Sequence, residues 1–428
     1  MPSQILLKGG MLLVRDESKR VVCQQSDLLI QDDRIYEIGY DIQPSEGARV
    51  IDCTGTLVSP GFVDTHRHQW QSQQKGLHAD QVLLDYYYSG NLGSSHYTPE
   101  DMFWGVLSSS LEAIDIGTTT VVDHARVNYS SDHSDSCSRQ RGYSWNNCFW
   151  YSLYLCYCAY PRVETWEPEL KIGKNPVAKG VIDTFRELAA MQLFGPRGRV
   201  RLGFAMDTIF KQPQLLKDIF AQVRELGAYL ITSHITRVNS SSICSSSIPG
   251  QMETALQVTR IRRLEGQMRD RKWDGTIGPS VEEALNLRTI LGAQAIGLSD
   301  KIGSLTVGKK ADIVIFNSNT PAMVAAADCN PVAAILLHSS VRDIETVIVD
   351  GVIRKENSSL NRFSIPQDIK QKEETDVSAS KPRGWDVRKE LQKSRQRLKE
   401  VWDNIDEDTA RNGLIRSFSQ NLTLGSDK

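Results

Sequence analysis

The sequence predicts an α/β fold, in which a (β/α)8 TIM-type barrel stands beside a small β-sandwich built from both ends of the chain. The chain has 428 residues, enough for one large domain and a smaller one. Short β-type runs occupy both ends of the sequence. Between them helical and strand patterns alternate, which is typical of parallel strands joined by crossover helices.

The small domain is expected to combine two distant segments, residues 1–56 and 300–355. The first holds the runs ILLKGGMLLV, DLLIQDDRIYEIG and ARVIDCTGTLVS, which are typical of strands and hairpins. The same pattern of short strand-type runs occurs again late in the chain, in GSLTVGKKADIVIF and IETVIVDGVIRK. Two β-rich ends around a long middle favour one composite β-sandwich domain.

The barrel is expected over residues 57–299, where helices and strands alternate. In such a barrel, residues at the carboxyl ends of the strands line the active site. The expected helices are Pro99–Ile116, Val181–Leu193, Leu215–Leu226 and Val281–Leu291, and the expected strands are Thr118–Asp123, Val200–Met206 and Tyr229–Ser233.

The chain changes character over residues 356–428. A polar linker, PQDIKQKEETDVSASKPRG, comes first and an amphipathic helix follows it. We expect this helix to pack against the body of the protein or against a second subunit. Its apolar side carries Val387, Leu391, Leu398, Val401 and Ile405.

The composition is that of an ordinary soluble protein. Charged residues make up 24% and the net charge is -2, so no charge imbalance favours binding to nucleic acid or to an anionic membrane surface. No apolar run of about 18 residues occurs, and the start MPSQILLKGG lacks the pattern of a signal peptide. A cytoplasmic location is therefore expected.

The eight cysteines do not form a disulfide framework in a chain of this length. Four of them, Cys137, Cys148, Cys156 and Cys158, lie within a short segment. A metal knuckle is one interpretation, but a single residue separates Cys156 from Cys158, whereas paired zinc ligands are usually two to four residues apart. Buried free thiols are the favoured interpretation.

The most informative motif is His66-Arg67-His68, at the end of the apolar run LVSPGFVDT. Residues two apart on a strand share one face, so both imidazoles can reach a single metal ion while Arg67 points the other way. This spacing suits two neighbouring ligands of zinc or another divalent metal. The tripeptide alone is also compatible with two surface histidines at a strand-to-loop junction.

Further candidates stand at the ends of other expected strands. His234 ends YLITSH and is placed as a third metal ligand would be, although a buried core histidine is the competing interpretation. Asp123 and His124 end VVDH and are candidate substrate-binding residues, with simple strand capping as the alternative. Asp207 follows another strand. We expect all of them at the same carboxyl edge as His66 and His68.

The combination of motifs resembles the amidohydrolase superfamily, in the branch of cytosine, guanine and S-adenosylhomocysteine deaminases and triazine hydrolases. The matching stretches are PGFVDTHRH, GTTTVVDH and ITSH, together with the closing pair SVEEALNLRTILGAQAIGL and GSLTVGKKADIVIF. The resemblance implies a metal-dependent barrel beside a composite β-sandwich. It also implies hydrolysis of carbon–nitrogen bonds, or sometimes carbon–chlorine bonds, of nitrogen heterocycles.

The chain departs from the family pattern in its metal ligands. The resemblance assigns His66, His68 and His234 as ligands, but the histidine after strand six and the aspartate after strand eight have no counterpart. About 45 residues separate His234 from the helix at Val281, whereas one barrel unit takes about 30. We therefore expect an incomplete barrel, truncated after residue 237 in the region of strands six to eight, from an isoform or a gene model that lacks an exon.

A second departure lies at Ser134–Tyr151, SDSCSRQRGYSWNNCFWY, where the alternation calls for a helix but helical periodicity is absent. A local disturbance of the reading frame is one explanation. An unusual substrate loop is the other.

The expected function is hydrolytic deamination of a nitrogen heterocycle by metal-activated water. The expected cofactor is one divalent ion, zinc first and iron as the alternative. The expected partner is a small-molecule substrate, and a homo-oligomer is left open. The catalytic proton shuttle stays unassigned, because Ile235, Thr236 and Arg237 follow His234 where family members often carry a glutamate. The alternative is a catalytically impaired remnant with a structural or regulatory role.

Overall fold

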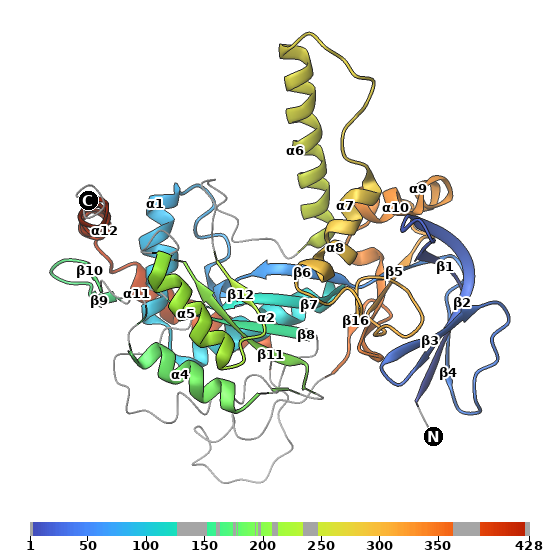
Figure 1. The fold of residues 1–428 in the computed structure, drawn as a ribbon, viewed down its shortest axis with the longest axis horizontal. Coiled ribbons are helices and arrows are strands. Elements are labelled where there is room, and N and C mark those ends of the chain that lie inside the picture. Colours follow the sequence, from blue (N-terminus) through green and yellow to red (C-terminus); the bar gives the residue numbers. More distant parts are fainter. Residues whose placement is uncertain are drawn as a thin grey trace.

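The structure of the chain is a computed structural model. Strands from the beginning of the chain lie beside late strands on one side of the molecule, and a second sheet with its helices lies on the other (Figure 1). The described residues are 3–125, 152–159, 163–173, 177, 179–192, 194–195, 198–207, 213–233, 247–362 and 386–423.

A nine-stranded sheet unites the two β-rich segments. Its order is β16-β15-β14-β13-β5-β1-β2-β3, with β4 paired to β1. Early and late strands therefore share one sheet, while its description as a sandwich stays a prediction. The strands are β1 (Gln4–Arg15), β2 (Val21–Gln31), β3 (Arg34–Gly39), β4 (Arg49–Asp52), β5 (Thr56–Pro60), β13 (Ile313–Asn317), β14 (Ile344–Val349), β15 (Val352–Glu356) and β16 (Ser359–Leu360).

Apolar side chains from both segments form the core of this sheet. Leu7 and Leu12 of β1 are fully buried in one cluster with Ile313 of β13. The late β-type run is shorter than the sequence predicts, because the backbone turns between Thr306 and Lys309, where Gly308 has φ of 89°. Leu305 consequently makes only an isolated parallel bridge, with Val14.

The apolar run before the His-x-His motif divides between two sheets. β5 belongs to the nine-stranded sheet, and β6 (Phe62–Arg67) belongs to a parallel sheet. Gly61 stands between them. The N–H of Gly61 donates to the carbonyl of Asp312 at 2.8 Å, whereas the N–H of Phe62 donates to the carbonyl of Gly117 at 3.0 Å. The chain therefore changes sheet within one residue.

The second sheet consists of parallel strands in the order β12-β11-β8-β7-β6. It confirms the mixed α/β class. The predicted shortening of the barrel after residue 237 and the irregular stretch Ser134–Tyr151 fall largely outside the described residues. The remaining strands of this sheet are β7 (Thr118–Ala125), β8 (Ser152–Ala159), β11 (Val200–Met206) and β12 (Ile231–Thr232).

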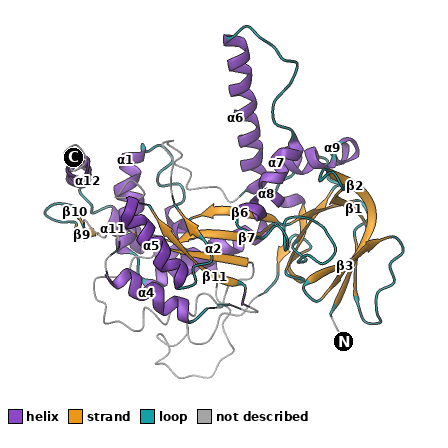
Figure 2. Cartoon of the chain, in the orientation of Figure 1, coloured by secondary structure: helices purple, strands orange, loops and turns teal. Residues whose placement is uncertain are grey.

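Helices α4 (Lys179–Ala190) and α5 (Pro213–Glu225) cover one face of the parallel sheet (Figure 2). Their apolar sides supply Phe185 and Val223 to the main core, where Phe204 of β11 is also fully buried. Phe185 and Phe204 meet edge to face, with ring centroids 5.3 Å apart. Alternation of helix and strand thus produces the layering that the sequence predicts.

Helix α2 (Pro99–Asp115) begins where the sequence places it. Pro99 stands in the first turn, and Thr98 and Asp101 form a capping box that satisfies the first N–H groups. The helix ends at Asp115, and Gly117 follows its C-cap with φ of 83°, close to Val314. A side chain there would be strained, so glycine fixes the turn into β7.

The single helix predicted over Val281–Leu291 is wrong, because two short helices occupy that range. Helix α7 (Val281–Leu287) ends before Arg288, and α8 (Ile290–Ala295) begins after Thr289. The carbonyl of Arg288 accepts a hydrogen bond of 2.7 Å from the N–H of Val63 on β6. Pairing with the strand thus interrupts the helix.

Helix α6 (Ile248–Arg269) projects away from the rest of the molecule (Figures 1 and 2). Its first turns are buried through Ile248, Met252 and Leu256, whereas Ile261 and Met268 further along are exposed. Among the described helices, none has the length and apolarity that a bilayer span requires.

Two helices close the chain. Helix α11 (Val387–Trp402) packs on α2 and on the short helix η1 (Gln69–Gln74), with Leu398 fully buried beside Trp70 and Met102. Helix α12 (Glu407–Thr423) follows. The other elements are α1 (Leu83–Tyr86), η2 (Tyr87–Asn91), η3 (Leu92–His96), β9 (Val163–Thr165), β10 (Lys171–Ile172), α9 (Val324–Cys329), α10 (Pro331–Ala333), η6 (Ala334–His338) and η7 (Val341–Asp343).

Candidate metal centre

His66 and His68 lie at the carboxyl end of β6 with their rings close together. The ring centroids are 5.0 Å apart and the planes are almost perpendicular. Arg67 points the other way, where its Nε donates to Ser109 Oγ at 3.0 Å and its guanidinium pairs with Glu112 at 3.3 Å. Strand alternation therefore puts the two imidazoles on one side, as the sequence predicts.

His124, at the end of β7, lies next to this pair and is fully buried. Its ring centroid is 5.3 Å from that of His66 and 5.4 Å from that of His68. The Nδ1 of His68 lies 2.9 Å from the carbonyl oxygen of His124. Neighbouring strands thus gather three imidazoles at one edge of the sheet, and the 5.0 Å between the His66 and His68 rings suits two ligands of one zinc ion.

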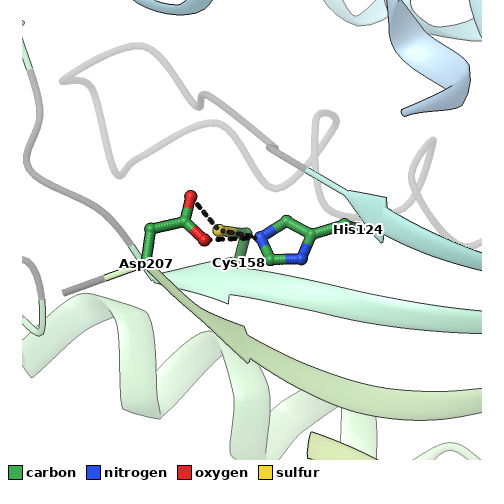
Figure 3. A group of neighbouring side chains, drawn as sticks. All are labelled: His124, Cys158 and Asp207. Carbon is green, nitrogen blue, oxygen red and sulfur yellow. Dashed lines mark hydrogen bonds and ion pairs between the residues drawn. The ribbon is translucent and has the colours of Figure 1, made fainter. Parts of the chain in front are cut away.

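Cys158 and Asp207 continue the group along the same edge of the sheet. Cys158 stands at the end of β8, and Asp207 follows β11 directly (Figure 3). The Nε2 of His124 lies 2.9 Å from Asp207 Oδ1 and 3.3 Å from Cys158 Sγ. The remaining pair, Cys158 Sγ and Asp207 Oδ2, is 3.8 Å apart. These three donor atoms could hold a metal ion.

The other nitrogen of the His124 ring faces Thr232 on β12, with Nδ1 3.3 Å from the Thr232 hydroxyl. The contact of 2.9 Å between Nε2 and Asp207 Oδ1 requires a ring N–H on Nε2, with Nδ1 accepting from the Thr232 hydroxyl. A cation bound at Nε2 would reverse these roles, so that an N–H on Nδ1 donates to Thr232. The ring of His124 is therefore held from both sides.

Asp123 is buried next to His124 and accepts a hydrogen bond of 3.1 Å from the N–H of Gln69. Burial raises the pKa of Asp123 to about 7, against the opposing effects of the Gln69 hydrogen bond and the charge of Arg67. The carboxyl thus ties β7 to the start of η1, directly after His68. Its role in substrate binding stays a prediction.

The described residues include most of the candidates from the sequence. His66, His68, Asp123, His124 and Asp207 come together at one edge, whereas His234 lies outside the described residues. Cys156 and Cys158 are buried thiols, as the sequence predicts. The contacts of Cys158 with His124 and Asp207 were not predicted from the sequence. The position of Cys158 at the end of a third parallel strand is the signal that could have found it.

Comparison with known protein families gives a match to the amidohydrolase family over residues 204–354. A 5'-deoxyadenosine deaminase from Methanobrevibacter smithii is 25% identical over 421 residues, covering 83% of this chain and 93% of the relative. A 5-methylthioadenosine/S-adenosylhomocysteine deaminase from Acetivibrio thermocellus is 23% identical, covering 73% of this chain and 84% of the relative.

Solved structures share the fold. An atrazine chlorohydrolase from Arthrobacter aurescens, complexed with zinc, covers 86% of this chain and 98% of its own, with a TM-score of 0.62 and 16% identity. An adenosine deaminase from Xanthomonas campestris with bound zinc covers 93% and 99%, with a TM-score of 0.61 and 13% identity. The family match over residues 204–354 and the relatives named as deaminases confirm the predicted resemblance to the amidohydrolases, and the chain is, by resemblance, a hydrolase.

Proposed function

We propose that the chain is a zinc-dependent deaminase of a nucleoside-like nitrogen heterocycle. The observation that carries this proposal is the convergence of the His66, His68 and His124 rings at the carboxyl edge of the parallel sheet. Active sites of (β/α)8 barrels lie at that edge. The relatives named as deaminases of 5'-deoxyadenosine and of 5-methylthioadenosine support the substrate class.

His66 and His68 are the proposed ligands, with His234 as the third by resemblance. His68 is held for this role because its Nδ1 contacts the carbonyl of His124 at 2.9 Å, so that Nε2 carries the lone pair. Arg67 anchors the strand between the two rings through Ser109 and Glu112. When bound, zinc supplies a water of lowered pKa that can attack an electrophilic ring carbon.

Metal analysis and an ammonia-release assay on the full chain test the proposal. We expect at least one divalent ion per chain and release of ammonia from 5'-deoxyadenosine, 5-methylthioadenosine or S-adenosylhomocysteine. The double variant His66→Ala/His68→Ala should lose the activity, because two of the ligands are gone. His338→Ala, an exposed histidine at the end of η6, is the matched control and should behave as the unaltered chain.

Two results would count against the proposal. Ammonia release that survives in the His66→Ala/His68→Ala variant would exclude these ligands. A folded, unaltered chain that releases no ammonia from any of the three substrates would instead favour the non-catalytic remnant that the absent ligands of strands six and eight suggest.

A further inference from the structure

We propose that His124, Cys158 and Asp207 form a second metal site, which takes a thiophilic divalent ion such as zinc. The three side chains come from the ends of three successive strands of the parallel sheet, β7, β8 and β11 (Figure 3). Their donor atoms all lie within 4.8 Å of one another. The site shares the His124 ring with the observation that supports the proposed function. None of its donors is His66, His68 or His234, so binding at Cys158 can be tested apart from deaminase activity.

The spacing of the donor atoms suits a tetrahedral ion. Zinc bonds of about 2.0–2.3 Å to nitrogen, oxygen and sulfur place neighbouring ligand atoms about 3.4–3.6 Å apart. His124 Nε2 lies 2.9 Å from Asp207 Oδ1 and 3.3 Å from Cys158 Sγ, and Sγ lies 3.8 Å from the other carboxylate oxygen, Oδ2. With one oxygen taken from Asp207, the three donor atoms lie within 4.8 Å of one another. Small rotations of the side chains would bring all three to bonding distance.

The arrangement is not that of a nucleophilic cysteine triad. In such a triad the thiol contacts one nitrogen of the histidine ring and the carboxylate contacts the other. Here both Cys158 and Asp207 lie against Nε2, while Nδ1 faces the hydroxyl of Thr232 at 3.3 Å. Convergence on one nitrogen is what a shared cation requires, and the Thr232 contact is the outer hydrogen bond that fixes a ligating ring.

Burial and charge favour a divalent ion with affinity for sulfur. His124 and Cys158 are buried, and the Asp207 side chain is only 15% exposed. A thiolate and a carboxylate together would bury two negative charges, which a doubly charged ion offsets. Sulfur and imidazole ligands select zinc or cobalt over magnesium or calcium, and three protein ligands leave a fourth position for water.

Cobalt substitution of the purified full chain tests the site, because a thiolate bound to Co²⁺ gives a near-ultraviolet charge-transfer band that histidine and carboxylate ligands do not give. We expect this band in the unaltered chain and in His66→Ala/His68→Ala. Cys158→Ser should abolish it. Cys156→Ser, on the same strand and equally buried, is the matched control and should keep it.

Asp207→Asn gives a second test that preserves the shape of the side chain. We expect it to weaken Co²⁺ binding at least tenfold, because an amide replaces an anionic ligand. Absence of the band in the unaltered chain, or a band that persists in Cys158→Ser, would show a hydrogen-bonded cluster without metal and overturn the proposal. Unchanged Co²⁺ affinity in Asp207→Asn would also overturn it. Loss of deaminase activity with the band intact would concern the proposed function alone.

Discussion

Gly61 is the residue at which the chain passes from the nine-stranded sheet into the parallel sheet. A Cβ atom built at this position would lie 2.3 Å from the Cγ2 and Oγ1 atoms of Thr119. Thr119 is buried in β7 and its β-branched side chain is stiff. The chain at Gly61 can therefore approach β7 this closely only because glycine has no side chain.

Gly61→Ala should lower the free energy of unfolding by about 1–3 kcal/mol, the usual cost of overpacking a core. Urea unfolding followed by circular dichroism measures it. Adding Thr119→Ala should recover part of the loss, since the clashing atoms are removed. Gly266→Ala, in α6 where no atom lies within 4 Å of the new Cβ, is the control. Equal stability of Gly61→Ala and the unaltered chain would disprove the close packing.

The face of a strand on which a side chain lies could be predicted from the sequence, because successive residues alternate between the two faces. The sequence places His66 and His68 on one side of β6 and Arg67 on the other, and the rings do lie 5.0 Å apart. Cys158 was not found, because spacing along the chain says nothing of its distance from Asp207. Only the pairing of β8 with β7 and β11 brings those side chains together.

Helix α11 connects the last part of the chain to the loop that follows the His-x-His strand. Ser394 donates from its hydroxyl to Asp101 Oδ1 at 2.7 Å and accepts from the side-chain amide of Gln73 at 2.9 Å. Arg397 pairs with the same Asp101. Because Gln73 lies in η1, directly after His68, α11 supports the segment that leaves the candidate site.

Leu398→Ala should lower the free energy of unfolding by about 2–5 kcal/mol, because Leu398 is fully buried against Trp70 and Met102 and its removal leaves a cavity. The shift of the urea midpoint checks this. Gln396→Ala, at an exposed position of the same helix, should change the midpoint little. Similar midpoints for both variants would mean that α11 does not contribute to the stability of the body.

Elements with long, regular patterns were predictable, and those shaped by a distant partner were not. Strand β11 has the expected bounds, and α2 ends one residue early. The helix predicted over Val281–Leu291 is interrupted because the carbonyl of Arg288 accepts a hydrogen bond from the N–H of Val63, a residue more than two hundred positions earlier in the chain. Local periodicity carries no information on such a bond.

A buried charge network joins the two sheets of the molecule. Arg199, just before β11, pairs with Asp350 at 2.7 Å, and Lys310 pairs with the same carboxylate at 2.6 Å. Asp312 accepts the N–H of Asp350 at 2.8 Å through Oδ1. Its Oδ2 is buried and has no hydrogen-bond partner among the described residues. Burial raises the pKa of Asp312 to about 7, despite the nearby charges of Lys310 and Arg199.

This network predicts a pH dependence of stability. The folded pKa of Asp312 is raised above its unfolded value, so the folded state binds more protons between about pH 4 and pH 7. The free energy of unfolding should therefore fall as pH rises through 7, by about 1.4 kcal/mol between about pH 6 and pH 8 from this group. Asp312→Asn should remove that fall, as measured by urea unfolding at both pH values.

Comparing the fall in the free energy of unfolding with pH between the unaltered chain and Asp312→Asn isolates the contribution of Asp312. The other charged groups, Asp350, Lys310 and Arg199, stay in place in both proteins. Asp350 has a pKa held low by Lys310 and Arg199 although its burial acts to raise it, so it stays ionised over this range. An identical fall in the Asp312→Asn variant would place the titrating group elsewhere.

The nine-stranded sheet also has a consequence for biosynthesis. β5 pairs with β13, and Leu57 lies opposite Phe316. The hydrogen bonds between these two strands therefore cannot form until Phe316 has left the ribosome. During that interval the nascent chain exposes the apolar edge that leads straight into His66. Contacts of such long sequence separation fold slowly and leave strands open to association, so the early strands of this sheet stay exposed to association until the late segment has been synthesised.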